Sequence, residues 1–498
     1  MKRLLLIIFY VMLSSCLVTK NQMKDNYKKS KIFERSIGIL QVSKQEPDFN
    51  APWKFKKVKN EFHLGAAIRT PLHNLVIITT AYAVEHGSSI NFLPYFNHKR
   101  IPLETIFVDR EINLALLTAQ DPGELKGLIP LELGENLEIG EQVNIYTDQK
   151  NIKLEYLESE LSGVEIYESL TSSYQSPHYL FSVNRKNLGW AEPVVKDGRL
   201  MALISGRGKE YTYAIPSMII RHFIQDNYRA QYKGFPALGV YTQSLTSPML
   251  RQYLKVKETS VGVRIAAIEA DSPFVDDLRV NDVLVSIAGK KISQKQMIKH
   301  SEWGQVAYVL AYNSLYPGDS LSLEIMRDGN PLSFTRTLKK YRANNKLIWQ
   351  YFPAAQVPHL IFGGLVFQEL SLDYLETWGK SWRSKANSSL LYQWYYKNLN
   401  SLEQKRVVVM TNVLADKINL GYESLQNKLL EKVNHISVRN MAEINSALGA
   451  PLEKNGKKYA IFEFSLGHGE IILSYQDLEK AHTRIAKRYG IHTKESFY

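Results

Sequence analysis

The only cysteine among the 498 residues is Cys16, and its surroundings indicate lipid attachment. A short positive start, Met1-Lys2-Arg3, precedes an apolar run at residues 4–13. Such a run fits the apolar core of a secretion signal, and it is shorter than the roughly 20 apolar residues that span a bilayer. Small residues then lead into the cysteine, Ser14-Ser15-Cys16, as in a bacterial lipoprotein signal, whose cysteine is acylated.

We therefore predict a lipoprotein signal peptide at residues 1–16 and a polar, lysine-rich tether at 17–33. The mature chain is then a membrane-anchored lipoprotein of the bacterial envelope, facing the periplasm or the cell surface. Lipidation holds a protein on a leaflet because each buried CH₂ contributes about 0.8 kcal/mol. The alternative is a soluble secreted protein whose apolar run merely ends in cysteine. With Cys16 acylated, no disulfide can form within the chain.

Composition excludes several other kinds of chemistry. Lysine and arginine exceed aspartate and glutamate by 62 − 49 = 13, which favours anionic surfaces. The basic residues are scattered, however, and no nucleic-acid-binding motif occurs, so we predict no nucleic-acid partner. One cysteine rules out a thiolate zinc site, and no other cluster has metal-ligand spacing. A Gly-Lys-Ser/Thr phosphate loop is also absent. We predict no metal and no cofactor.

The elements that would position a site are mostly short strands. Apolar runs at residues 37–40, 75–78, 114–117 and 143–146 alternate with turn residues, which favours a β-barrel or sandwich. A helix is expected at 216–228. The runs at 321–326 and 332–338 flank Asp328-Gly329 and predict a hairpin in a second unit. A third unit is expected to have strands, a helical middle and a last helix.

Several segments match a known family in order along the chain. They are Gly65-Ala66-Ala67, Thr79-Thr80-Ala81-Tyr82-Ala83-Val84, Ile112-Asn113-Leu114-Ala115-Leu116-Leu117, Leu131-Glu132-Leu133-Gly134, Leu188-Gly189-Trp190-Ala191-Glu192-Pro193-Val194 and Tyr213-Ala214-Ile215-Pro216. Together they resemble HtrA/Deg serine proteases. A second set of segments resembles the plant-type Deg branch, which has an atypical second PDZ-like domain. These segments are Gly234-Phe235-Pro236-Ala237-Leu238-Gly239, Ser247-Pro248-Met249-Leu250-Arg251, Phe362-Gly363-Gly364-Leu365-Val366-Phe367 and Asp416-Lys417-Ile418-Asn419-Leu420-Gly421-Tyr422.

The resemblance implies a mainly β fold with some α: a chymotrypsin-like double β-barrel followed by two PDZ-like α+β domains. We expect the trypsin-like domain at 34–230 and a PDZ domain at 234–340. A linker at 341–358 and a second PDZ-like domain at 359–490 follow. Related proteases assemble as trimers or multiples of them, so a trimer-based homo-oligomer is also implied.

The same resemblance assigns the histidine, aspartate and serine positions of the catalytic triad to Tyr82, Asn113 and Trp190. Triad hydrolysis needs a serine oxygen, a histidine that takes its proton and an acid that orients the histidine. Tyrosine, with an ordinary pKa near 10, is a poor base. Asparagine cannot stabilise an imidazolium, and tryptophan has no nucleophile. We predict a pseudoprotease in which Trp190 and Tyr82 either fill the cleft or form an aromatic platform for a ligand.

The turn that would hold the oxyanion is altered as well. Leu188, Ala191 and Glu192 replace glycines of the family, and Gly189 stands one position out of register. An oxyanion hole needs backbone N–H groups presented by a tight turn, and Glu192 adds negative charge there. We therefore expect no oxyanion stabilisation.

A relocated triad would need other side chains to converge. The candidates are His86, Asp109, Ser182 and Ser205. Such offsets along strands point to different depths of a barrel, so we do not expect them to meet. His63 and His73 lie near turn residues and are expected at the surface.

The PDZ resemblance implies a peptide site in the second unit. Ala237, Leu238, Gly239 and Val240 align with the family's carboxylate-binding loop and the strand after it. An extended peptide would add as a strand, with its C-terminal carboxylate on backbone N–H groups. Gly239 would allow close backbone approach. The alternative is that these residues simply belong to the core.

Three functions remain open. The preferred one is a non-proteolytic scaffold that binds proteins or peptides in the envelope, either chaperone-like or regulatory. The second is a serine-type endopeptidase that is active through an unrecognised site. The third is a surface lipoprotein that binds host matrix or an anionic polymer, for which salt-sensitive binding would be the sign.

Overall fold

The computed structural model describes residues 31, 33–149, 153–169, 172, 174–183, 188, 190–229, 231–256, 261–342, 346–348, 356–396, 406–465 and 469–492. The predicted signal peptide, Cys16, most of the tether and much of the predicted linker 341–358 lie outside these residues. Within them, no helix has both the length and the apolar character needed to cross a membrane.

The first structural unit begins with a closed antiparallel barrel, barrel 1, in the strand order β1-β2-β3-β6-β5-β4. Its elements are β1 (Ile37–Lys44), β2 (Lys59–Arg69), β3 (Leu75–Thr79), α2 (Ala81–Val84), β4 (Gly87–Pro94), β5 (Ile101–Asp109) and β6 (Leu114–Ala119). Leu40, Ile77, Phe92 and Leu117 pack inside it. Gly65 keeps the wall tight there, since a Cβ would lie 2.6 Å from the Ile77 side chain.

Barrel 2 follows as a 7-stranded sheet in the order β11-β8-β9-β10-β13-β12-β7, which closes because β11 also pairs with β12. Its elements are β7 (Glu132–Leu133), β8 (Gln142–Gln149), β9 (Lys153–Glu168), β10 (Gln175–Phe181), β11 (Pro193–Lys196), β12 (Arg199–Arg207), β13 (Thr212–Pro216) and α3 (Ser217–Asn227). The predicted double barrel and its closing helix are therefore confirmed.

The second unit is built on a 6-stranded sheet in which β15 is an edge strand. Its elements are β14 (Pro236–Ala237), β15 (Val240–Ser244), α4 (Pro248–Tyr253), β16 (Val263–Ile268), β17 (Val283–Ile287), β18 (Lys290–Lys291), β19 (Met297–His300), β20 (Gly304–Ala307), α5 (Leu310–Asn313), β21 (Ser320–Arg327), β22 (Asn330–Thr337) and β23 (Lys339–Lys340). Asp328 and Gly329 both have positive φ, at 51° and 87°, so the predicted hairpin turn is confirmed.

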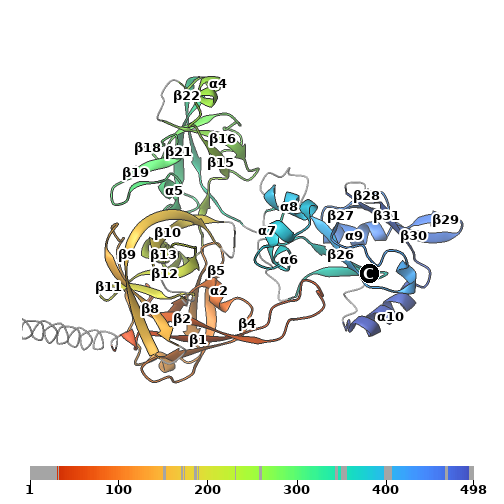
Figure 1. Cartoon of the computed structure of the whole chain (residues 1–498), viewed down its shortest axis with the longest axis horizontal. Coiled ribbons are helices and arrows are strands. Elements are labelled where there is room, and N and C mark those ends of the chain that lie inside the picture. Colours follow the sequence, from red (N-terminus) through yellow and green to blue (C-terminus); the bar gives the residue numbers. More distant parts are fainter. Residues whose placement is uncertain are drawn as a thin grey trace, which may run out of the picture.

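The third unit contains an 8-stranded sheet. Its elements are β24 (His359–Phe362), β25 (Leu365–Glu369), α6 (Leu372–Glu376), α7 (Trp382–Lys385), α8 (Ser388–Tyr395), β26 (Val408–Val413), β27 (Lys428–Val433), β28 (Ile436–Ser437), α9 (Met441–Leu448), β29 (Leu452–Lys454), β30 (Lys457–Phe464), β31 (Glu470–Ser474) and α10 (Leu478–Tyr489). The expected helical middle and last helix are both present. Figure 1 shows this unit beside barrel 1 and the second unit beside barrel 2.

The second unit is held firmly on barrel 2. Trp303 Nε1 donates to the Leu137 carbonyl at 2.7 Å, and Asn313 Nδ2 donates to the Tyr174 hydroxyl at 2.9 Å. That hydroxyl in turn donates to the Pro236 carbonyl at 3.2 Å. Apolar residues of both units form one continuous core cluster. The predicted carboxylate-binding loop thus has a rigid neighbour in barrel 2.

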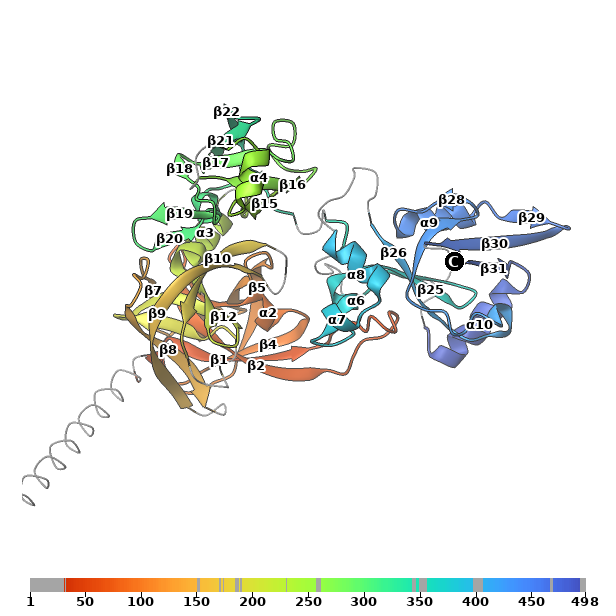
Figure 2. The same ribbon diagram turned by 45° about the horizontal axis from the view of Figure 1, so that its top comes forward.

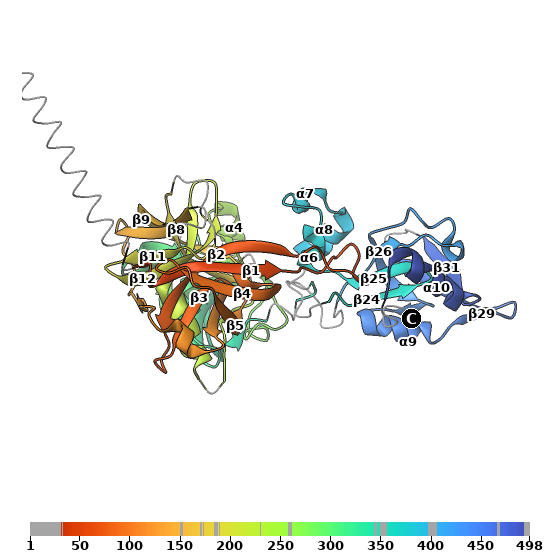
Figure 3. The ribbon, with the colours of Figure 1, turned by 90° about the horizontal axis from the view of Figure 1, so that it is seen from below.

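The hairpin of β1 and β2 reaches out of barrel 1 towards the third unit (Figures 2 and 3). At its tip, Phe49 is only 5% exposed and packs in an apolar cluster of the third unit. Gln368 Nε2 donates to the Phe49 carbonyl at 3.0 Å, and Trp53 Nε1 donates to the Tyr489 carbonyl at 3.2 Å. The hairpin therefore fastens the third unit to barrel 1.

Replacing Phe49 tests this connection. Phe49→Ala removes a buried ring, a change that typically costs about 3 kcal/mol, so we expect faster amide exchange in β25 and α10. Phe55→Ala is the matched control, because Phe55 lies on the same hairpin and is 44% exposed. Hydrogen exchange with mass spectrometry measures both variants. Unchanged protection in Phe49→Ala would mean that the hairpin does not hold the third unit.

Candidate functional site

The three positions assigned to the triad come from both barrels. Tyr82 lies in α2, whose first turn is capped by the Thr80 hydroxyl accepting from the Ala83 amide at 3.3 Å. Asn113 precedes β6 with a left-handed φ of 59°, and its Oδ1 accepts from the Tyr82 amide at 2.9 Å. Trp190 precedes β11, and its carbonyl accepts from the Leu64 amide at 3.4 Å. The structure therefore brings all three together between the barrels.

Tyr82 and Trp190 pack directly on each other. Their ring centroids lie 4.9 Å apart, with an interplanar angle of 48°. Both side chains are half-buried, whereas Asn113 is buried. Aromatic pairs at such distances attract each other beyond their buried area. The two rings thus occupy the space between the positions where a nucleophile and its base would have to meet.

Lys44, at the end of β1, contacts Tyr82 of this pair. Its side chain is 6% exposed, and its Nζ lies 2.9 Å from Glu61 Oε2. The same nitrogen donates to the Tyr82 carbonyl at 2.7 Å and lies 4.7 Å from the centroid of the Tyr82 ring. A carboxylate, a carbonyl and an aromatic face together compensate the buried cation.

His63 is buried, and the prediction of a surface position for it is wrong. It is 8% exposed, its Nε2 lies 3.2 Å from Glu61 Oε2, and its ring meets Tyr82 edge-on at 6.2 Å. It is buried because its position on β2 places its ring against Tyr82. Burial, aided by the nearby Lys44 charge, lowers the pKa of His63 to about 4. His63 is therefore neutral at pH 7. His73 is exposed, as predicted.

The protonation of Tyr82 also bears on its chemistry. Burial raises the pKa of the Tyr82 phenol, and the neighbouring Glu61 carboxylate raises it further. The phenol therefore stays protonated at neutral pH. It can donate a hydrogen bond, but it cannot accept a proton as a general base.

In the turn before β11, the Ala191 amide is bound to β12. Ala191 has a positive φ of 70°, and its N–H donates to the Ile204 carbonyl at 2.9 Å. The Ile204 amide returns a hydrogen bond to the Glu192 carbonyl at 3.0 Å, and Glu192 is 3% exposed. Gly189 lies outside the described residues. The Ala191 amide is thus bound into the strand and is not offered to a substrate.

The structure does not bring together the side chains that a relocated triad would need. Asp109 accepts from the amides of Glu111 and Ile112 at 2.7 and 3.2 Å and from the Tyr232 hydroxyl. Ser205 Oγ donates to the Tyr213 carbonyl at 3.4 Å. Among the described residues, no hydrogen bond links any two of the four candidates. They are His86, Asp109, Ser182 and Ser205. In the same part of the chain, no group of His, Cys, Asp and Glu is placed to hold a metal ion.

The predicted carboxylate-binding loop lines a cavity of about 470 Å³ next to barrel 2. Ala237, Leu238, Gly239 and Val240 all contribute to its wall. Ser272 Oγ donates to the Leu238 carbonyl at 2.7 Å. Gly239 has a φ of 65°, and a Cβ there would lie 3.0 Å from Ser272. The loop is therefore rigid and suited to glycine.

Within the described residues, both the loop and strand β15 carry backbone groups that form no hydrogen bond. The amides of Leu238 and Gly239 donate no hydrogen bond within the described residues. In that part of the chain, β15 pairs only with β16, which leaves its outer edge open. An edge strand beside free amides is the arrangement that takes an added peptide strand.

Lys44 and Glu61 are site residues that were not predicted. The one local signal is the spacing of Glu61 and His63, since residues two apart on a strand share a face. Nothing local marks Lys44, because a lysine at a strand end is normally exposed.

Comparisons with known proteins find two domain families and several relatives. PDZ-domain family models match residues 236–338 and 353–497. Over 469 residues the chain is 24% identical to Protease Do-like 2, chloroplastic, from Arabidopsis thaliana, covering 90% of this chain and 73% of that protein. It is 22% identical over 389 residues to Protease Do-like 4, mitochondrial, from the same plant, covering 74% and 68%. The solved structure of the HtrA-type protease AlgW with decapeptide gives a TM-score of 0.45 at 16% identity, covering 63% of this chain and 98% of that chain.

The burial of His63 makes stability depend on pH. Its pKa is about 4 in the fold and 6.5 as an ordinary value, so between these pH values the unfolded chain binds the extra proton. Its contribution is present above pH 6.5 and is lost as pH falls towards 4, about 3 kcal/mol. In urea unfolding followed by tryptophan fluorescence, His63→Gln should lose less stability over this range than the wild type. His73→Gln, at the exposed histidine, should behave like the wild type, and equal losses in all three proteins would contradict the assignment.

Proposed function

The chain belongs to the HtrA/Deg protease family and carries two PDZ domains, and we propose that it binds proteins or peptides without cleaving them. The observation that carries this proposal is the packing of Tyr82 against Trp190, at 4.9 Å, where a triad would operate. An indole has no nucleophilic atom, and a protonated phenol accepts no proton. Loss of the nucleophile or base of such a triad costs about 10⁶ in rate.

The binding activity is supported by the second unit. Leu238 and Gly239 line the 470 Å³ cavity, and within the described residues their amides donate no hydrogen bond and the outer edge of β15 is unpaired. A peptide C-terminus could place its carboxylate on the loop and its backbone on the strand. Hydrogen bonds from Trp303 and Asn313 hold the second unit, which contains this loop, on barrel 2. We therefore assign peptide C-termini as the ligands of this PDZ domain.

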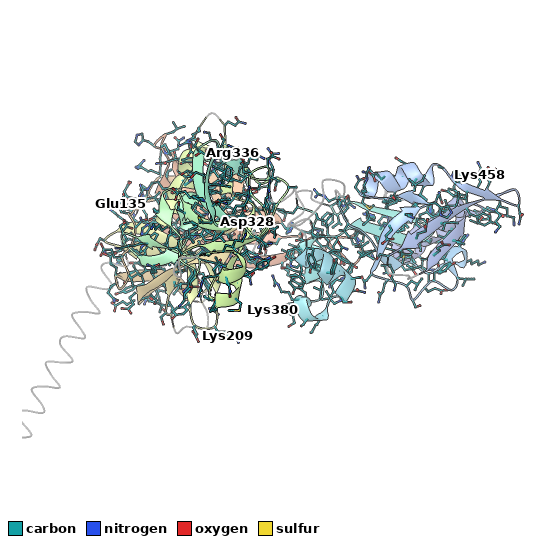
Figure 4. All side chains as sticks on the ribbon, turned by 90° about the horizontal axis from the view of Figure 1, so that it is seen from above. Glu135, Lys209, Asp328, Arg336, Lys380 and Lys458 are labelled. Atoms are coloured by element: carbon teal, nitrogen blue, oxygen red, sulfur yellow. The ribbon has the colours of Figure 1, made fainter. Side chains whose placement is uncertain are left out.

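We further propose that the protein is a lipoprotein of the bacterial envelope, anchored through Cys16. The signal-like residues 1–16 support this, as does the use of a single cysteine. There it would serve as a chaperone-like or regulatory scaffold, assembled in a trimer-based oligomer like other members of its family. Figure 4 labels Arg336 of the second unit and Lys458 of the third unit, two basic side chains that lie on separate parts of the molecule.

The alternative is an endopeptidase that works through another site. One observation favours it: His63 Nε2 lies 3.2 Å from Glu61 Oε2, beside the cleft between the barrels. Against it, His63 is 8% exposed and its described contacts include no serine or threonine hydroxyl. The pair acts with Lys44 to support Tyr82.

Proteolysis of unfolded casein separates the two functions. We expect no cleavage by the wild-type chain over hours, and none by the triple variant Tyr82→His, Asn113→Asp, Trp190→Ser, because Leu188, Ala191 and Glu192 still replace the glycines of the oxyanion turn. Peptide products are measured by mass spectrometry, with an active HtrA protease as the positive control. Cleavage by the wild-type chain that a single other substitution abolishes, such as His63→Gln, would establish the endopeptidase instead.

Lipid attachment has its own test. In cells fed a labelled fatty acid, the wild-type chain should carry the label and partition with membranes. Cys16→Ser should lose the label and become soluble, because its hydroxyl does not replace the thiol in acylation. Ser15→Ala is the matched control, since a small residue is kept there. Label that persists in Cys16→Ser would rule out this anchor.

A further inference from the structure

We propose that the PDZ site beside barrel 2 selects peptides with a basic penultimate residue, and that Tyr395 and Glu168 recognise this residue. The inference rests on the proposed peptide binding and adds the class of peptide. It assigns a specificity role to the third unit, which contributes Tyr395, and to barrel 2, which contributes Glu168.

The cavity at the carboxylate-binding loop has walls from all three units. The second unit supplies the loop and Tyr312 of α5. Barrel 2 supplies Glu168 at the end of β9, and α8 of the third unit supplies Tyr395. A ligand seated on the loop therefore meets side chains from two units outside the PDZ domain.

Strand geometry determines which ligand residue meets which wall. In an added strand, successive side chains point to opposite faces. When the carboxylate sits on the Leu238 and Gly239 amides, the last side chain points into the PDZ domain, between β15 and α5. The penultimate side chain then points away from that core, towards barrel 2 and α8. Glu168 and Tyr395 are the residues that line this outer wall.

The charges at the cavity favour a basic side chain. Among the described lining residues, the charged ones are Glu168 and Glu269. Glu269 is already engaged, because it pairs with Lys346 and accepts from the Tyr241 hydroxyl at 2.7 Å. Glu168 is exposed and has no ion pair among the described residues. It therefore remains as the carboxylate that a ligand cation can reach, although the whole chain carries a net charge of +13.

Tyr395 supplies the second half of the recognition. Three tyrosines of this region are exposed: Tyr392 at 59%, Tyr395 at 61% and Tyr396 at 47%. Tyr392 and Tyr396 pack on each other at 4.6 Å, whereas Tyr395 lines the cavity. An aromatic face beside a carboxylate is well suited to a lysine or arginine side chain, since a cation over a ring gains about 0.5–2 kcal/mol.

The test uses the full chain in mild detergent and labelled decapeptides ending in Lys-Phe or Glu-Phe, with binding followed by fluorescence anisotropy. We expect the Lys-Phe peptide to bind about tenfold more tightly than the Glu-Phe peptide at low salt. Tyr395→Ala and Glu168→Gln should each weaken binding of the Lys-Phe peptide about three- to fivefold and leave the Glu-Phe peptide nearly unchanged. The matched controls are Tyr392→Ala on the same helix and Glu165→Gln on the same strand, which should change neither peptide.

The outcomes separate this inference from the proposed function. Equal affinity for the two peptides, or variants that keep the wild-type preference, would overturn the selectivity while leaving peptide binding intact. Peptide binding itself is tested with Gly239→Val, which should abolish binding of both peptides because a branched side chain at a φ of 65° collides with Ser272. If the wild type and Gly239→Val both fail to bind, the proposed function falls and the selectivity with it.

Discussion

The buried ammonium group of Lys44 is the constraint on which the rest of the molecule depends. A lysine charge taken out of water costs several kcal/mol unless it is paired and hydrogen-bonded. Here Glu61, the Tyr82 carbonyl and the Tyr82 ring meet that requirement at once. Lys44 contacts both Tyr82, which fills the cleft between the barrels, and Glu61, which lies on β2. The same cation therefore stabilises the cleft and the base of the β1–β2 hairpin.

That hairpin links the cleft to the third unit. Its base carries Lys44 and Glu61 beside Tyr82, and its tip carries Phe49 and Trp53 into the third unit. A cavity of about 270 Å³ at this junction is lined by Lys44 and Tyr82 on one side and by residues of α6 on the other. The third unit therefore covers the flank of the cleft, and Tyr395 of its α8 lines the cavity next to Leu238 and Gly239.

The sequence predicted the fold well wherever the signal is local. Alternating apolar runs predicted the strands of both barrels, and Asp328-Gly329 predicted a hairpin turn that requires positive φ at both residues. The meeting of Tyr82, Asn113 and Trp190 followed from resemblance to a family rather than from periodicity. Two features escaped prediction. Lys44 is buried although lysines are usually exposed. The hairpin contact between Trp53 and Tyr489 joins residues 436 positions apart, for which no local pattern exists.

We propose that the cleft between the barrels holds no reactive serine and is filled by the packed rings of Tyr82 and Trp190. Labelling of the full chain with a fluorophosphonate, followed by peptide mass spectrometry, tests it most directly, because this reagent modifies serines that a base has activated. We expect no modified serine, whether or not casein is present. A covalent adduct on one serine, formed at one per chain and prevented by casein, would contradict this proposal. It would identify a reactive serine nucleophile.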